Sequence, residues 1–136
     1  MSVLVRIERH IFDAVVVDAR ADPGQELCGL LGGRDGVITR AFPTANAALD
    51  PSTRYEISPR DIFDRMREMR EAGIDLLGIY HSHPNGKNEP SPRDVELAFY
   101  PETPYLIVSP LPGVSRPIRA FLIHDGQVSE VEIQVV

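Results

Sequence analysis

Cysteine and tryptophan are nearly absent from this sequence. Its 136 residues include one cysteine, Cys28, and no tryptophan. A single cysteine excludes an internal disulfide and is typical of a reducing compartment, so we expect a cytoplasmic location. Because free cysteine is among the most buried residue types, we expect Cys28 to be a small core residue and not a nucleophile or a ligand.

Positive charge and long apolar runs are also scarce. Fourteen lysines and arginines face 20 acidic residues, which gives a net charge of −6. This balance argues against binding nucleic acid or an acidic membrane through phosphate contacts. No apolar run has the length of a membrane span, and the first residues lack the order of a signal peptide. The remaining composition, 43% hydrophobic and 25% charged, is that of a globular protein, and we expect one domain over residues 1–136.

Two of the four histidines stand together in the stretch H-S-H-P at residues 81–84. The apolar segment before it, residues 74–80, has the length and composition of a strand buried on both faces. Side chains alternate along a strand, so His81 and His83 point to the same side. Such a pair is suited to chelating a divalent metal.

A helix start follows at residues 91–94, S-P-R-D, with a hydroxyl at the N-cap, proline at the first helical position and an acid in the first turn. The loop at residues 84–90 can bring Asp94 back against the strand. Two imidazoles and a carboxylate suit zinc, and three protein ligands leave a fourth position open, as in catalytic sites. The alternative is a chance pair of histidines followed by a capping box that only begins a helix.

With an upstream acid, these residues resemble a known motif. Glu26 stands in E-L-C-G-L-L-G-G, and the order is then H-x-H, seven residues, serine, two residues, aspartate. This order resembles the JAMM motif (MPN+, JAB1-type) of zinc metalloproteases, and the resemblance extends from about residue 10 to residue 124. It implies one zinc per chain. The resemblance also implies that His81, His83 and Asp94 bind this metal and that Glu26 and Ser91 take part in catalysis.

Each catalytic residue has a second interpretation. Glu26 is suited to take a proton from water and pass it to the leaving amine, but a glutamate after a Pro-Gly turn is more often simply solvated. Ser91 could donate a hydrogen bond to the oxyanion of the tetrahedral intermediate, or it could only cap the helix. His10 and His124 are expected at the surface and not among the ligands.

The substrate is expected from the resemblance alone. Stand-alone prokaryotic members of the family are associated with ubiquitin-like sulfur-carrier proteins that end in Gly-Gly, and one compact domain without an additional module resembles them. The implied reaction is hydrolysis after this Gly-Gly, which releases an amino acid such as cysteine or a conjugated protein. Two alternatives stay open: a non-catalytic MPN-type interaction scaffold and a RadC-like protein associated with DNA repair. The filled ligand positions disfavour the first, and the acidic charge and the Glu26 segment disfavour the second.

The remaining pattern predicts an α/β fold. Strands are expected at residues 3–7, 27–33, 37–42, 55–57, 74–80, 105–108, 116–123 and 128–136, and helices at 8–20, at 58–73 and from 91 to about 102. In the second helix, interleaved arginines and acids predict a solvated face, and Ile62, Phe63, Met66 and Met69 predict a core face. A central mixed, mostly antiparallel sheet flanked by helices follows, and the resemblance also implies such a β-α-β sandwich.

Overall fold

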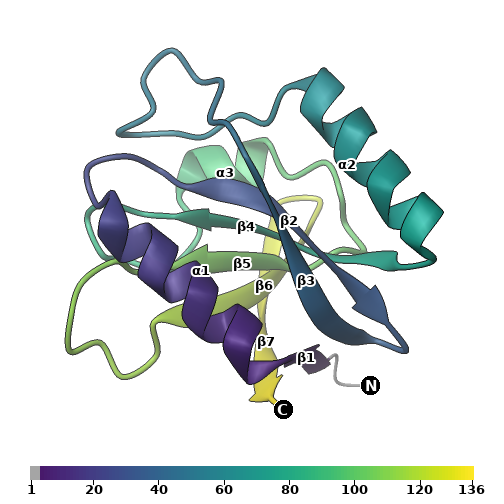
Figure 1. Ribbon diagram of the computed structural model, residues 1–136. Helices are drawn as coiled ribbons and strands as arrows, with labels where there is room; N and C mark the ends of the chain where they lie inside the picture. The colour runs from purple at the N-terminus through teal and green to yellow at the C-terminus, as the bar shows by residue number, and fades with distance from the viewer. Residues whose placement is uncertain (1–3) are drawn as a thin grey trace.

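Seven strands and three helices make up residues 4–136, the part of the chain that a computed structural model describes (Figure 1). The strands are β1 (Leu4–Ile7), β2 (Cys28–Arg34), β3 (Val37–Thr44), β4 (Asp75–Ser82), β5 (Tyr105–Val108), β6 (Ile118–His124) and β7 (Gln127–Val135). The helices are α1 (Arg9–Ala21), α2 (Pro59–Ala72) and α3 (Pro92–Glu96). Residue 3, part of the first expected strand, lies outside the described residues.

Two hairpins have the turn chemistry that their sequences predict. Asp35 and Gly36 between β2 and β3 have φ of 53° and 75°, and Asp125 and Gly126 between β6 and β7 have φ of 49° and 78°. Positive φ at both central residues is what a two-residue type I′ turn requires, and an Asp-Gly pair meets it at low cost. Both hairpins are therefore antiparallel, as expected.

The sheet closes on itself through β1. This strand pairs in parallel with β3 on one side and with β7 on the other, so the strand order β1-β3-β2-β4-β5-β6-β7 forms a closed barrel. β4 and β5 are also parallel, and the other neighbouring pairs are antiparallel. The expected mixed sheet flanked by helices is confirmed, whereas the two partners of β1 could not be predicted from its own residues.

Two apolar clusters lie on the two sides of β4. Tyr80 belongs to the cluster that α1 covers, and Ile79 belongs to the cluster that α2 covers. In Figure 1, α1 lies across the front of β5 and β6, and α2 lies apart from it at the upper right. Because side chains alternate, His81 continues the side of Ile79, and Ser82 continues the side of Tyr80. The predicted alternation therefore aims the first histidine away from α1.

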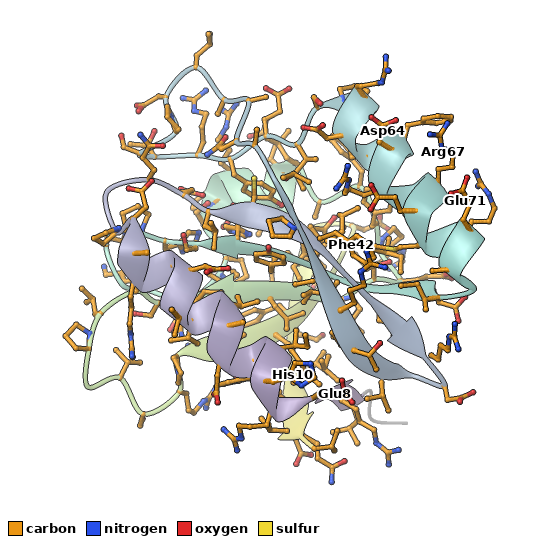
Figure 2. All side chains as sticks on the ribbon, in the orientation of Figure 1. Glu8, His10, Phe42, Asp64, Arg67 and Glu71 are labelled. Carbon is orange, nitrogen blue, oxygen red and sulfur yellow. The ribbon has the colours of Figure 1, made fainter. Side chains whose placement is uncertain are left out.

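α2 has both of its predicted ends and its solvated face. The Ser58 hydroxyl accepts a hydrogen bond from Asp61 N at 3.1 Å, and Gly73 ends the helix at φ 69°. Figure 2 shows Asp64, Arg67 and Glu71 pointing outward. The expectation that Phe63 faces the core is wrong, because its side chain is 59% exposed, while Met69 on the inner face is 2% exposed. No helix among residues 4–136 is long and apolar enough to cross a membrane.

Two expected elements differ from the structure. Residues 55–57 form no strand. The Glu56 N–H donates to the side chain of Asn46, and the Glu56 carbonyl accepts from Ala47 N. These local groups therefore take the hydrogen bonds that a neighbouring strand would otherwise make. The expected helix from Ser91 to about residue 102 is shorter, since α3 ends at Glu96.

Candidate metal centre

β4 leads directly into the two histidines. His81 pairs with Cys28 of β2 and with Ile107 of β5, and beyond the strand the His83 N–H donates to the Val108 carbonyl at 3.0 Å. The two residues are 0% and 6% exposed. Their Nε2 atoms are 3.1 Å apart, so both imidazoles point to one place, as the spacing predicts.

The capping box of α3 aims the predicted third ligand. Asp94 N donates to the Ser91 hydroxyl at 3.1 Å, and Ser91 N donates to Asp94 Oδ2 at 2.9 Å. The same Oδ2 atom lies 3.2 Å from His81 Nε2 and 3.0 Å from His83 Nε2. The two interpretations of this segment are therefore compatible, because the box that begins the helix also turns the carboxylate towards the histidines.

These three atoms form a nearly equilateral triangle with sides of 3.0–3.2 Å. Ligand atoms about 2.0–2.2 Å from a tetrahedral zinc stand roughly 3.3–3.5 Å apart, so a small adjustment accommodates such an ion. Glu26 adds a further oxygen, and one ligand atom each from Glu26, His81 and His83 lie within 4.8 Å of one another. The donor set and its spacing fit a divalent metal.

Burial and hydrogen bonds shift the pKa values of the titratable groups in this cluster. Burial lowers the pKa of His81. Burial also acts to lower the pKa of His83, but hydrogen bonds to Asp94 and to the Lys87 carbonyl outweigh it and raise this pKa above 6.5. Burial acts to raise the pKa of Asp94, and hydrogen bonds with both histidines outweigh it and hold this pKa well below 3.8. A divalent cation would compete with protons for these groups.

Glu26 is brought to the cluster by β2. It precedes Cys28, which pairs with His81, and its N–H donates to the Pro51 carbonyl at 2.7 Å. Its side chain is not solvated, since the residue is 5% exposed and Oε1 has no hydrogen-bond partner among the described residues. Burial raises the pKa of Glu26 from 4.5 to about 7, against the attraction of His83. A carboxylate in this state is suited to taking a proton near neutral pH.

The two imidazoles are supported in different ways. His83 Nδ1 lies 2.6 Å from the Lys87 carbonyl, to which it can only donate, so in the neutral imidazole the lone pair belongs to Nε2, which faces the cluster. His81 Nδ1 has no partner among residues 4–136, and its ring instead stacks on Tyr55 with centroids 4.2 Å apart and planes at 18°. The sequence predicted Tyr55 only as part of a strand. Its separation from the histidines along the chain matches no motif that would have placed it beside them.

An open cleft of about 600 Å³ meets the cluster. Ser91 and Asp94 line it together with residues from the segment 48–57, from α2 and from the segment after α3, among them Tyr55, Ile62, Met66, Leu97 and Phe99. The Ser91 hydroxyl oxygen accepts from Asp94 N, so its proton is free to be donated to a molecule in the cleft.

The other candidate residues lie away from the cluster or in the core. Cys28 is 1% exposed, and its Sγ lies 3.5 Å from Thr44 Oγ1, as expected of a core residue. His10 is exposed beside Glu8 at the start of α1 (Figure 2), and His124 is exposed at the end of β6. Both histidines are therefore at the surface, in agreement with the expectation.

Curated relatives of this chain include three that are 34% to 39% identical. A desampylase of Haloferax volcanii is 39% identical over 94 residues, 68% of each chain. A CysO-cysteine peptidase of Mycobacterium tuberculosis is 34% identical over 132 residues, 96% of this chain and 90% of its own. A probable TtuB-protein conjugate cleaving protease of Thermus thermophilus is 37% identical over 126 residues, 93% of this chain and 80% of its own.

Solved structures support the same relationship. A protein of Desulfitobacterium hafniense superposes with a TM-score of 0.84 at 32% identity, covering 98% of this chain and 93% of its own. A JAB1/MPN domain protein of Archaeoglobus fulgidus, at 18% identity and a TM-score of 0.63 over 96% of this chain and 97% of its own, shares the fold. The family model described as prokaryotic homologs of the JAB domain matches residues 8–123. On this match and these identities, the chain belongs to the family of prokaryotic JAB-domain proteins.

Proposed function

We propose that this protein is a zinc-dependent peptidase or isopeptidase that hydrolyses the amide bond after the C-terminal Gly-Gly of a small ubiquitin-like or sulfur-carrier protein. The released group is an amino acid such as cysteine or a conjugated protein. The observation that carries the proposal is the convergence of His81, His83 and Asp94 beside a buried, unpartnered Glu26. The names of the three relatives, a desampylase, a CysO-cysteine peptidase and a TtuB-protein conjugate protease, support the substrate class.

Zinc is proposed as the resident metal, held by His81, His83 and Asp94. Two neutral imidazoles and one carboxylate suit zinc, and three protein ligands leave an open position. When bound, zinc supplies a Lewis acid that polarises a carbonyl and makes water acidic near neutral pH.

Glu26 is proposed as the general base and then the general acid. Its Oε1 has no other partner in the described chain, so it is available to take a proton from water and to hand it to the nitrogen of the leaving amine. We assign Glu26 to proton transfer and not to the metal, because Asp94 Oδ2 lies at 3.0–3.2 Å from both imidazole nitrogens and already completes the triangle.

Ser91 is proposed as the donor to the oxyanion. Its hydroxyl proton is not used in the capping box, and its side chain lines the cleft. A hydrogen bond that strengthens as negative charge develops on the scissile carbonyl oxygen lowers the barrier.

An extended, glycine-ended tail suits this site. Glycine residues let the backbone approach the buried ligands closely, and the cleft of about 600 Å³ provides a path to them. The reducing compartment inferred from the single cysteine makes the cytoplasm the proposed location.

The test is to incubate the zinc-loaded protein with Gly-Gly carriers extended by one residue or by a lysine-linked protein, and to weigh the products. We expect loss of the group after Gly-Gly. Two controls are matched to it: Glu26→Gln, which should keep zinc but lose turnover because an amide cannot take the proton, and carriers in which Gly-Gly is replaced by Ala-Ala. Intact carriers together with cleavage of unrelated peptides would contradict the substrate, and full turnover by zinc-loaded Glu26→Gln would contradict the role of Glu26.

A further inference from the structure

His81 differs from His83 in what holds its ring. Metal-binding histidines normally donate their second ring N–H to a carbonyl or a carboxylate, which fixes the plane of the imidazole and its tautomer. His83 has such a partner in the Lys87 carbonyl at 2.6 Å. His81 is 0% exposed, yet its Nδ1 has no partner among the described residues. On the Nδ1 side of the ring, packing must therefore do what a hydrogen bond does for His83.

Two rings pack on this imidazole: His83 meets it edge-on with centroids 4.8 Å apart, and Tyr55 covers its face. Tyr55 stacks on the His81 imidazole with centroids 4.2 Å apart and an angle of 18° between the planes. A stacked ring resists rotation of the imidazole out of this plane, because the rotated ring would collide with the tyrosine face. Nε2 is then kept pointing at His83 and Asp94.

Tyr55 is itself held by the side chain of Asn46. Asn46 Nδ2 donates to the Arg54 carbonyl at 3.0 Å, and Asn46 Oδ1 accepts from Glu56 N at 3.1 Å. These two bonds fix the backbone of the residues on either side of Tyr55. A third bond, from Ala48 N to Asn46 Oδ1 at 3.0 Å, holds the Asn46 side chain in place. A segment without a strand partner is thereby given a defined backbone.

The same amide also reaches the proposed base. Asn46 Nδ2 donates to the Glu26 carbonyl at 2.9 Å. The Asn46 side chain therefore hydrogen-bonds both to the backbone of Glu26 and to the backbone on either side of Tyr55.

We propose that Tyr55, clamped by Asn46, is the positioning residue of His81, and that its ring does for this ligand what the Lys87 carbonyl does for His83. The assignment rests on the proposed metal site. It concerns the aromatic ring and not the hydroxyl group, so phenylalanine should substitute for tyrosine.

The test measures zinc affinity by competition with a chromophoric chelator at constant pH. Loss of support around a metal ligand typically weakens binding about 10- to 100-fold, and we expect Tyr55→Leu to raise the Kd for zinc by at least the lower figure. Tyr55→Phe should stay within about twofold of the unchanged protein on the same reasoning. Tyr100→Leu is the matched control, because Tyr100 lines the same cleft and stacks on no ligand. Unchanged affinity in Tyr55→Leu, or equal losses in Tyr55→Phe and Tyr55→Leu, would overturn the assignment.

A second measurement needs no variant, in case Tyr55→Leu does not fold. In the metal-free protein, the ring current of Tyr55 should shift the His81 ring protons upfield of those of His83 and of the exposed His10 and His124. Absence of that shift overturns the stacked geometry whatever the variants do. If the unchanged protein takes up no zinc, the proposed function fails and this assignment fails with it, whereas zinc uptake that is insensitive to Tyr55→Leu overturns this assignment alone.

Discussion

At Glu26, the proposed role in catalysis and the requirement of stability oppose each other. A carboxylate that is 5% exposed, with one oxygen lacking any hydrogen-bond partner in the described chain, is costly to keep ionised. The cost appears as a pKa raised by burial to about 7. Active sites commonly retain groups of this kind, and replacing them often stabilises the fold.

We therefore predict that Glu26→Gln stabilises the metal-free protein in a pH-dependent way. Because the pKa is 4.5 when solvated and about 7 when folded, the folded state binds more protons between these values, and the contribution of Glu26 to the free energy of unfolding falls as pH rises. Above pH 7 the folded protein bears the full destabilisation caused by the ionised Glu26 carboxylate. At pH 8 the variant should be more stable by on the order of 1 kcal/mol, and at pH 5 the difference should nearly vanish.

Urea unfolding of both proteins with a chelator present, at the two pH values, measures this difference. An equal gain at pH 5 and pH 8 would show that the effect comes from packing and not from the charge. A loss of stability at pH 8 would contradict the raised pKa.

At the scale of one element, α3 is too short to be stable without its caps. It has five residues, and isolated helices of that length do not form in water. Ser91 at the N-cap, proline at the next position and Asp94 three residues later make the helix begin at a defined residue. Since Asp94 Oδ2 also faces the histidines, the local capping chemistry sets the position of a proposed metal ligand.

Ser91→Ala should separate capping from catalysis. The variant loses the hydroxyl that accepts from Asp94 N, which costs about 1 kcal/mol of stability. The bond from the Ser91 backbone N–H to the Asp94 carboxylate does not use the hydroxyl and remains, so zinc affinity should change little. Turnover should fall, since the proposed oxyanion donor is gone.

Ser58→Ala is the matched control, because Ser58 caps α2 through the same bond, from Asp61 N at 3.1 Å, away from the cluster. Both variants should lose similar stability in thermal unfolding, and only Ser91→Ala should lose kcat. Equal turnover in the two variants would leave Ser91 as a cap alone.

For the whole molecule, the cluster joins segments that are far apart in the chain. Glu26 precedes β2, the histidines end β4, and Asp94 lies on α3. A metal bound by groups from separate elements binds the folded state and not the unfolded chain, so its binding energy adds to the stability of the entire domain.

Zinc should therefore raise the melting temperature of the domain. At a free concentration 100 times the Kd, the expected stabilisation is about 2.7 kcal/mol, which corresponds to a rise of roughly 5–15 °C for a chain of this size. A double variant, His81→Ala with His83→Ala, should show no rise. Calorimetry with and without a chelator gives the comparison, and identical melting temperatures in the unchanged protein would mean that the site as described does not bind zinc.

The sequence by itself determined the features that depend on near neighbours. The alternation along β4, the capping box at Ser91 and the two Asp-Gly turns each follow from residues one to three positions apart, and each is present in the structure. The family, the fold class and the hydrolase class, which rested on the motif and its order, are confirmed by the relatives and by the fold. The individual roles of the site residues stay predictions.

Only the tertiary structure decided which distant groups meet. Glu26 reaches the histidines because Cys28 pairs with His81 across β2 and β4, a register set by the packing of whole strands. Tyr55 reaches His81 from a segment without a strand partner, where its own residues predicted a strand, and β1 closes the sheet by pairing with two strands distant in sequence. The physical reason is the same in each case: local spacing sets the direction of a side chain, whereas contact between remote segments depends on how the complete core packs.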